Sequence, residues 1–172
     1  GRIGAPMLMA RIPLPRVPER LALYEAGLAE SGLDAAAQRR LRARTALWRF
    51  VHVADSQARA EDELVAALRG TRHHMVHARA TYNPPDFQVP ESRVNPWMDP
   101  RVSDDEGVRY ALRTASLYGT APRVAEQVAE LRDAGIQHVL CQMSTGYLPH
   151  ERILDSMRRF GEAVLPAFRS SD

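Results

Sequence analysis

The apolar positions of the chain follow two periods, one typical of buried strands and one typical of amphipathic helices. Short apolar runs lie at residues 6–10, 46–54 and 138–143, and the second run is rich in aromatic and β-branched side chains. Each run is too short for an ordinary helix and is followed by turn or helix-capping residues. We therefore predict three buried strands at these positions.

Between the predicted strands, apolar residues recur at helical spacing. The stripes comprise Leu21, Tyr24 and Leu28; Ala60, Leu64 and Leu68; Val124, Val128 and Leu131; and Ile153, Met157, Phe160 and Val164. Capping residues Asp55-Ser56 and Thr120 precede two of these stripes, and Gly32, Gly70 and Gly135 end three of them. Strands that alternate with helices predict a parallel sheet, and therefore an α/β fold.

Residues 71–105 interrupt this pattern, because they contain five prolines and no sustained period. A stretch of this length inside a compact domain is more often a functional lid or excursion than a plain connector. Its apolar residues Tyr82, Phe87, Trp97 and Met98 suit a lid, and a packed surface loop is the alternative. We predict one domain, residues 1–172, with a Pro-rich excursion at about 71–105.

Three parallel strands make an incomplete α/β domain, because both faces need cover and the outer strands leave open edges. The first apolar run begins within the first ten residues, with no helix before it. We therefore expect that further strands belong N-terminal to residue 1. We also expect that the strand at residues 138–143 lacks a neighbour along one edge.

The amino-acid composition excludes several classes of function. The 172 residues are 45% hydrophobic and 26% charged, which is typical of one soluble globular domain. All 23 basic residues are arginine, which excludes a P-loop lysine and a pyridoxal Schiff base. The net charge of +2 gives no reason to expect a nucleic acid or a membrane as partner. The single Cys141 and the lack of a long apolar run predict a cytoplasmic protein.

No established catalytic motif is present. His73 and His77 lie four residues apart, but no third ligand is near them in the sequence, so we predict no metal site. His52 lies inside a predicted strand, where a satisfied core or cavity-wall histidine is more common than a general base. Ligands of parallel α/β folds bind at the carboxyl ends of the strands, which here are residues 11–13, 55–56 and 144–147.

Several segments, in order, resemble the C-terminal half of bacterial-luciferase-like flavin-dependent monooxygenases. They are GAPMLM at residues 4–9, RLALY at 20–24 with Gly32, FVHVAD at 50–55, YGTAP at 118–122 with VAEQV at 124–128, LRDAGI at 131–136, and SMRRF at 156–160 with VLP at 164–166. The Gly-Thr-x-Pro turn and the Ala-Gly-Ile strand entry are the most specific. Ala121 departs from the family, in which many members run Gly-Thr-Pro, and it shifts the local helix cap.

The resemblance implies parallel β/α units from about the last three strands of a (β/α)8 TIM barrel. It also implies an enzyme that oxygenates a small organic substrate with O2 and reduced flavin (FMN), which a flavin reductase can supply. The family's flavin is held largely by strands that this chain does not include, so no catalytic or cofactor-binding residue is assigned. The resemblance implies five candidate residues for the substrate side of the flavin cavity, namely Met9, His52, Asp55, Ser144 and Thr145.

Two alternatives stay open. The chain can be a non-catalytic half-barrel that works by association, either as a homo-oligomer or with the missing N-terminal half. The parent protein can also be a deazaflavin-dependent oxidoreductase, because that group shares the barrel.

Overall fold

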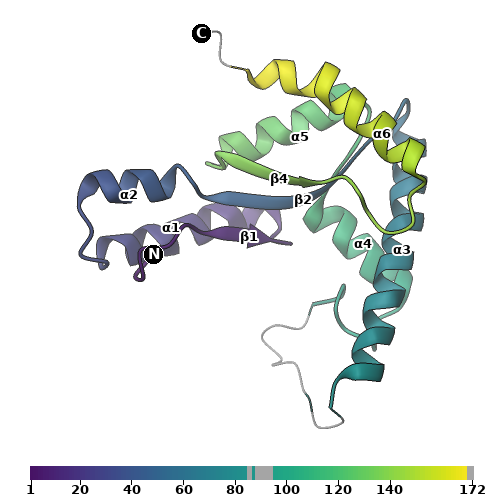
Figure 1. Cartoon of the computed structure of the whole chain (residues 1–172), viewed down its shortest axis with the longest axis horizontal. Coiled ribbons are helices and arrows are strands. Elements are labelled where there is room, and N and C mark those ends of the chain that lie inside the picture. The colour runs from purple at the N-terminus through teal and green to yellow at the C-terminus, as the bar shows by residue number, and fades with distance from the viewer. Residues whose placement is uncertain (85–86, 88–94, 170–172) are drawn as a thin grey trace.

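The computed structural model describes residues 1–84, 87 and 95–169 (Figure 1). The strands are β1 (Leu8–Ala10), β2 (Ala46–Val53), β3 (Ser116–Gly119) and β4 (His138–Gln142). The α-helices are α1 (Val17–Ala29), α2 (Ala35–Arg42), α3 (Gln57–Tyr82), α4 (Asp104–Ala115), α5 (Ala121–Asp133) and α6 (His150–Arg159). The short helical turns are η1 (Leu14–Arg16), η3 (Phe160–Val164) and η4 (Leu165–Phe168). None of these helices is long and apolar enough to cross a membrane.

Strand β2 is the centre of a parallel four-stranded sheet. Trp48 pairs with both Ala10 of β1 and Leu140 of β4, and Phe50 pairs with both Ser116 of β3 and a residue of β4. Because a strand has only two edges, β1 and β3 follow one another along one edge of β2. Strand β4 takes the other edge (Figure 1). The predicted parallel α/β class is confirmed.

The structure contains one strand more than the sequence predicts. Residues 116–119, for which the pattern predicts no strand, pair with the carboxyl-terminal half of β2. The strand is only four residues long and runs directly into the Gly119-Thr120 turn, so it leaves almost no alternation to detect. The helix after this turn begins as predicted, with Thr120 at its N-cap position and Pro122 in its first turn.

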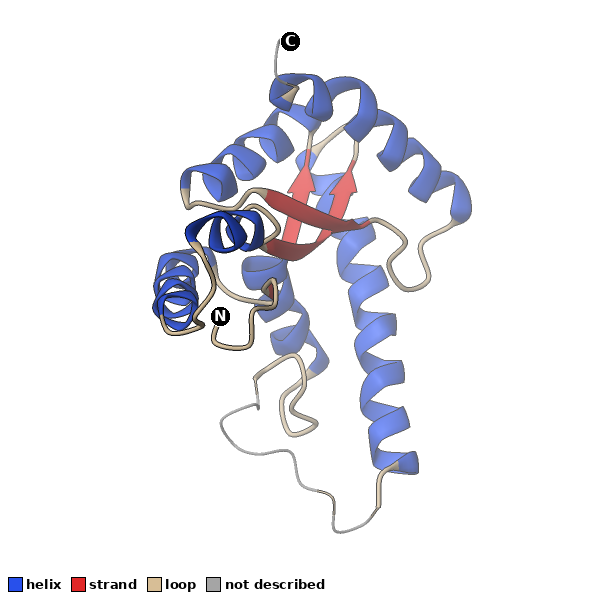
Figure 2. Ribbon diagram, turned by 60° about the vertical axis from the view of Figure 1, so that its left-hand side comes forward, coloured by secondary structure: helices blue, strands red, loops and turns tan. Residues whose placement is uncertain are grey.

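Helices cover both faces of the sheet. Leu47, Val51 and Val53 project from one face of β2 into a hydrophobic cluster with α1, α5 and η3. Phe50, on the opposite face, packs in a second cluster with α3 and α4, and Trp48 lies against that cluster. Figure 2 shows the strands between these two groups of helices. Burial of alternate residues on two apolar faces is what fixes β2 at the centre.

The segment predicted as a Pro-rich excursion, at about residues 71–105, begins as helix, which corrects the predicted start of the excursion. Helix α3 continues to Tyr82, and its inward positions after Leu64 and Leu68 include Arg72, which is 2% exposed. Because this inward position holds an arginine, the helical spacing of apolar residues stops at Leu68 in the sequence. Its guanidinium donates to the carbonyl oxygens of Asp99 (2.8 Å) and Val102 (2.7 Å) and so fastens the segment before α4 to α3.

Strand β4 has one strand neighbour among the described residues. It pairs with β2 over residues 138–142, and no other described strand lies along its outer edge. The predicted open edge is therefore confirmed for the described part of the chain. The strand is also less buried than predicted, since Leu140 is 47% exposed and Cys141 is exposed.

Candidate functional site

The buried imidazole of His52 is paired with a carboxylate from α3. His52 is 1% exposed, and its Nε2 lies 2.7 Å from Oε2 of Glu63. The other ring nitrogen, Nδ1, is buried and has no hydrogen-bond partner among the described residues. With Glu63 ionised, Nε2 carries the hydrogen and donates a hydrogen bond to the carboxylate. In the neutral ring, Nδ1 is then a free acceptor inside the protein.

Arginines hold Glu63 in its ionised form. Burial alone raises the pKa of Glu63, but hydrogen bonds from Arg59 and His52, with the charge of Arg59, outweigh that effect and lower the pKa. Arg59 Nε donates to Glu63 Oε1 at 2.9 Å, and its Nη1 donates to Asp55 Oδ2 at 2.6 Å. Arg152 of α6 lies 3.5 Å from the same Glu63 oxygen. We call these five residues the His52 cluster.

The His52 cluster brings together two of the five sequence candidates. His52 belongs to β2, and Asp55 lies just after it at the carboxyl end of the strand, joined through Arg59. Met9 lies elsewhere: it pairs with Leu47 and is 3% exposed in the hydrophobic cluster on the other face of the sheet. Residues five positions apart on a strand face opposite sides, so Met9 and His52 do not share a wall within this sheet.

The remaining two candidates lie in the loop after β4, which is docked on α3. Thr145 is fully buried, and its hydroxyl donates to the carbonyl oxygen of Gln142 at 3.4 Å. Ser144 is exposed. Gly146 approaches α3 so closely that a Cβ there would lie 2.3 Å from the carbonyl oxygen of Ala67. That these residues line a substrate cavity stays a prediction.

Arg11, at the carboxyl end of β1, is a candidate that the sequence reasoning did not single out individually. Its φ of 53° is in the left-handed region, where residues other than glycine are uncommon. Its guanidinium lies 6.0 Å from the centre of the Trp48 ring, and its Nη1 is 3.9 Å from Sδ of Met98. Burial lowers the pKa of Arg11, and the nearby charge of Arg79 lowers it further.

Arg11 has no carboxylate partner among the described residues, although a like charge lies near it. Strained backbone concentrates at functional sites, and a guanidinium without a carboxylate partner can pair with an anionic ligand. A positive φ is invisible in the sequence when the residue is not glycine. Only the position after a strand pointed to this part of the chain.

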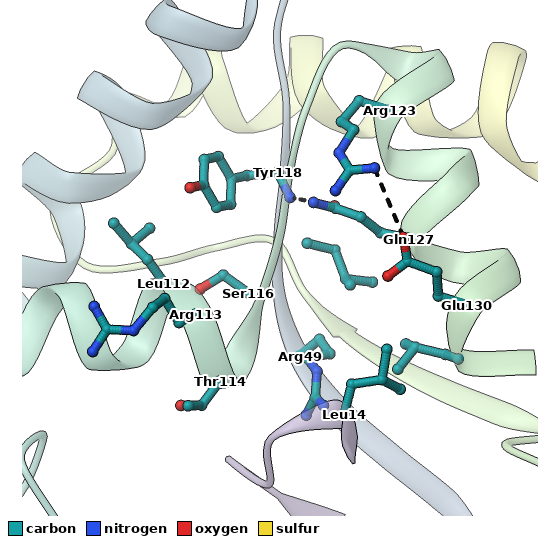
Figure 3. Close-up of a pocket in the computed structure, with 12 residues that line it drawn as sticks. Leu14, Arg49, Leu112, Arg113, Thr114, Ser116, Tyr118, Arg123, Gln127 and Glu130 are labelled. Atoms are coloured by element: carbon teal, nitrogen blue, oxygen red, sulfur yellow. Dashed lines mark hydrogen bonds and ion pairs between the residues drawn. The ribbon is translucent and has the colours of Figure 1, made fainter. Parts of the chain in front are cut away.

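A cavity of about 240 Å³ lies beside the edge of β2 along which β1 and β3 pair (Figure 3). Its lining comprises Leu14, Arg49, Leu112, Arg113, Thr114, Ser116, Leu117, Tyr118, Arg123, Gln127, Glu130 and Leu131. Arg49 is the buried charged group of this set, at 3% exposure. No sequence motif marks the cavity, since its residues come from η1, β2, α4, β3 and α5.

The described residues contain no group of three or more histidine, cysteine or acidic side chains placed to hold a metal ion. His73 and His77 both lie on the exposed side of α3.

Three solved structures share the fold of this chain. A monooxygenase from Streptomyces bottropensis superposes with a TM-score of 0.64 at 18% identity, covering 98% of this chain and 43% of that one. The oxygenating constituent of 3,6-diketocamphane monooxygenase from Pseudomonas putida, a type II Baeyer-Villiger enzyme in complex with FMN, gives 0.57 at 16% identity and covers 92% and 41%. An F420-dependent secondary alcohol dehydrogenase with an F420-acetone adduct gives 0.54 at 16% identity and covers 96% and 43%.

The chain therefore spans less than half the length of these structural relatives, which have the luciferase-like TIM-barrel fold. No curated protein sequence matches it. The family profile described as luciferase-like monooxygenase matches residues 1–138, which is most of the chain. Together with the parallel β/α architecture, this match confirms the resemblance seen in the sequence, and the chain belongs to the luciferase-like monooxygenase family.

Proposed function

We propose that this chain is the C-terminal portion of a flavin-dependent monooxygenase that oxygenates a small organic substrate with reduced FMN and O2. The observation that carries the proposal is the family match over residues 1–138, supported by a structural relative that holds FMN. A flavin reductase in the cytoplasm would supply the reduced cofactor. When bound, reduced flavin supplies the electrons that activate O2.

The residues of this chain fit two needs of such a site. Arg11 offers a positive charge with no carboxylate partner in the described chain, beside the ring of Trp48, and this suits an aromatic cofactor that carries a phosphate. His52 offers Nδ1, a buried acceptor without a partner.

Within the proposed enzyme, the His52 cluster would hold a proton at a fixed atom. Glu63 accepts a hydrogen bond from Nε2–H and so fixes the tautomer of the ring, which leaves Nδ1 as its acceptor nitrogen. Arg59 and Arg152 keep Glu63 ionised, and the burial of His52 excludes water from the ring. We propose that Asp55, Ser144 and Thr145 line the substrate side farther from the His52 ring, and Met9, on the other face of the sheet, is no longer a candidate.

The test compares the 172-residue chain with a version extended by any coding sequence upstream of Gly1. We expect the extended version to bind reduced FMN under anaerobic conditions and to consume O2 when air is admitted with substrate, while the short chain binds weakly. Tight binding of FMN by the short chain would refute our placement of most of the flavin site outside it. Failure of both versions to bind FMN or F420 would refute the function.

A matched pair of histidine variants tests the role of His52. In whichever version is active, His52→Asn should lower the rate of O2 consumption that is coupled to product formation and change the pH dependence of this rate. His73→Asn, at an exposed position of α3, should leave both unchanged. Equal rates and equal pH profiles for the two variants would remove His52 from the proposed mechanism.

A dehydrogenase that uses a deazaflavin is the second candidate, because one structural relative is an F420-dependent alcohol dehydrogenase. The two candidates differ in their electron acceptor. Substrate oxidation that reduces F420 without O2 uptake identifies the dehydrogenase, whereas O2 uptake with reduced FMN identifies the monooxygenase.

A further inference from the structure

The cavity beside Arg49 lies where one strand ends and another begins. Along the same edge of β2, the last residue of β1 pairs with Trp48, and Ser116, the first residue of β3, pairs with Phe50. Arg49 is the β2 residue between these two pairings. The cavity opens at this break and is bounded by η1, α4 and α5 (Figure 3).

Arg49 carries a positive charge that no described acidic side chain neutralises by direct contact. Its side chain is 3% exposed, and its two hydrogen bonds go to the carbonyl oxygens of Ile12 (2.8 Å) and Trp48 (3.0 Å). Burial lowers its pKa to about 10, so the guanidinium is still charged at neutral pH. A buried charge without a counter-ion is costly, which favours an anion from outside.

Further donors surround the same space. The amide oxygen of Gln127 accepts a hydrogen bond from the backbone N–H of Tyr118 at 2.9 Å. Its NH2 group has no hydrogen-bond partner among the described residues. Arg113 and Arg123 lie at the exposed rim. Figure 3 shows the side chains of Arg123 and Gln127 on α5, beside the segment that carries Tyr118.

One acidic side chain faces this set. Glu130 lines the cavity and lies 3.8 Å from Arg123, whose hydrogen bond at 2.9 Å goes instead to Glu126. Glu130 is half exposed and therefore screened by water. Arg123 is thus paired with carboxylates, whereas Arg49 and Arg113 form no ion pair among the described residues, so the lining keeps a net positive charge.

The size of the cavity limits its ligand. Pockets for drug-sized molecules and cofactors measure roughly 300–1,000 Å³, so a space of about 240 Å³ is too small for a whole flavin. One water takes about 30 Å³ in the liquid, so a small oxyanion and its waters fit. We propose that this cavity is a binding site for a small oxyanion, either phosphate or the carboxylate of a small organic acid, with Arg49 as its central ligand.

The test is a titration of the 172-residue chain with sodium phosphate and, separately, with sodium acetate, both at constant ionic strength against sodium chloride. The readouts are calorimetry and the NMR signal of the Arg49 Nε–H group. We expect a saturable change with at least one oxyanion and none with chloride. Phosphate alone, acetate alone or both support the site and identify its ligand, whereas no saturation with either overturns it.

Variants separate a binding role from a structural one. Arg49→Met keeps a long side chain but removes the charge and the donors, and we expect at least a tenfold loss of oxyanion affinity. Arg16→Met, at an exposed arginine paired with Glu19, is the control and should bind as the wild type does. If Arg49→Met folds and keeps the full affinity, Arg49 only anchors Ile12 and the proposal is wrong. If it does not fold, the wild-type NMR titration decides.

Discussion

The hydroxyl of Ser156 accepts a hydrogen bond of 2.9 Å from the backbone N–H of Val53, although the two residues are 103 positions apart. Both are buried, at 0% and 1% exposure. The pairing of β4 with β2 ends at Phe50, so the N–H of Val53 has no strand partner on that edge. Ser156 supplies the missing acceptor and ties α6 to the carboxyl end of β2, next to the His52 cluster.

Ser156→Ala should therefore destabilise the protein. The substitution leaves the N–H of Val53 buried without an acceptor, which costs about 1–3 kcal/mol of unfolding free energy. Urea denaturation at pH 7 measures the loss. Ser144→Ala, at an exposed serine, is the control and should change stability by less than about 0.5 kcal/mol. An equal effect of the two substitutions would show that the bond to Val53 adds nothing.

Glu63→Gln should lower stability at neutral pH and make it less sensitive to acid. The pKa of Glu63 in the folded protein lies below its ordinary value of 4.5. The folded state therefore gains stability from the carboxylate above pH 4.5, and this gain is lost as the pH falls through the lowered pKa.

We expect the wild type to exceed Glu63→Gln by roughly 1–3 kcal/mol at pH 7 and the difference to shrink below pH 4.5. Urea denaturation at a series of pH values gives both quantities. Glu61→Gln is the matched control, because Glu61 is exposed on the same helix. A gap between wild type and Glu63→Gln that stays constant down to pH 3 would contradict the assignment.

The parts of the fold that the sequence predicted are those in which local pattern and tertiary packing agree. Strand β2 is a clear example, because its apolar run is buried on both faces. Helix α3 was predicted too short because Arg72 occupies a core position and bonds carbonyl oxygens that come 24 to 30 residues later. Such a partner is set by tertiary structure and leaves no periodic signal.

The candidate site shows the same division. The position of His52 within a strand, and its burial, follow from the sequence. Its partner Glu63 lies in a polar stretch of α3 that reads as a solvated helix face, and only the docking of α3 on β2 brings it to 2.7 Å. The Arg49 cavity combines residues of five elements, so no local spacing could indicate it.

Gly146→Ala should loosen the loop that carries Thr145. The φ of Gly146 is +54°, and an added Cβ would lie 2.3 Å from the carbonyl oxygen of Ala67 and 2.5 Å from the hydroxyl of Thr71. The left-handed backbone and the collision together should cost more than about 1 kcal/mol. Thermal unfolding measures the stability, and amide exchange in the loop measures the local effect. Gly161→Ala is the control, because an added Cβ there would meet no atom within 4 Å outside the neighbouring helix backbone, and a matching loss there would refute the steric cause.

The open edge of β4 decides between a barrel strand that upstream strands cover and the half-barrel alternative. No described strand pairs with its outer edge, and Leu140 is 47% exposed on it. An edge with free backbone groups and an apolar side chain is a template for pairing with another chain. We therefore expect the 172-residue chain to associate as its concentration rises, which size exclusion with light scattering measures.

Leu140→Lys should shift this association toward the monomer, because a lysine on an edge strand must be desolvated before a second strand can pair. Leu23→Lys removes a similarly exposed leucine, at 59%, from α1 and should associate as the wild type does. A wild type that stays monomeric at every concentration would reject the edge as an interface. If upstream strands cover β4 in the extended protein, that version should be monomeric at this edge and insensitive to Leu140→Lys, which distinguishes a covered barrel strand from a self-associating half-barrel.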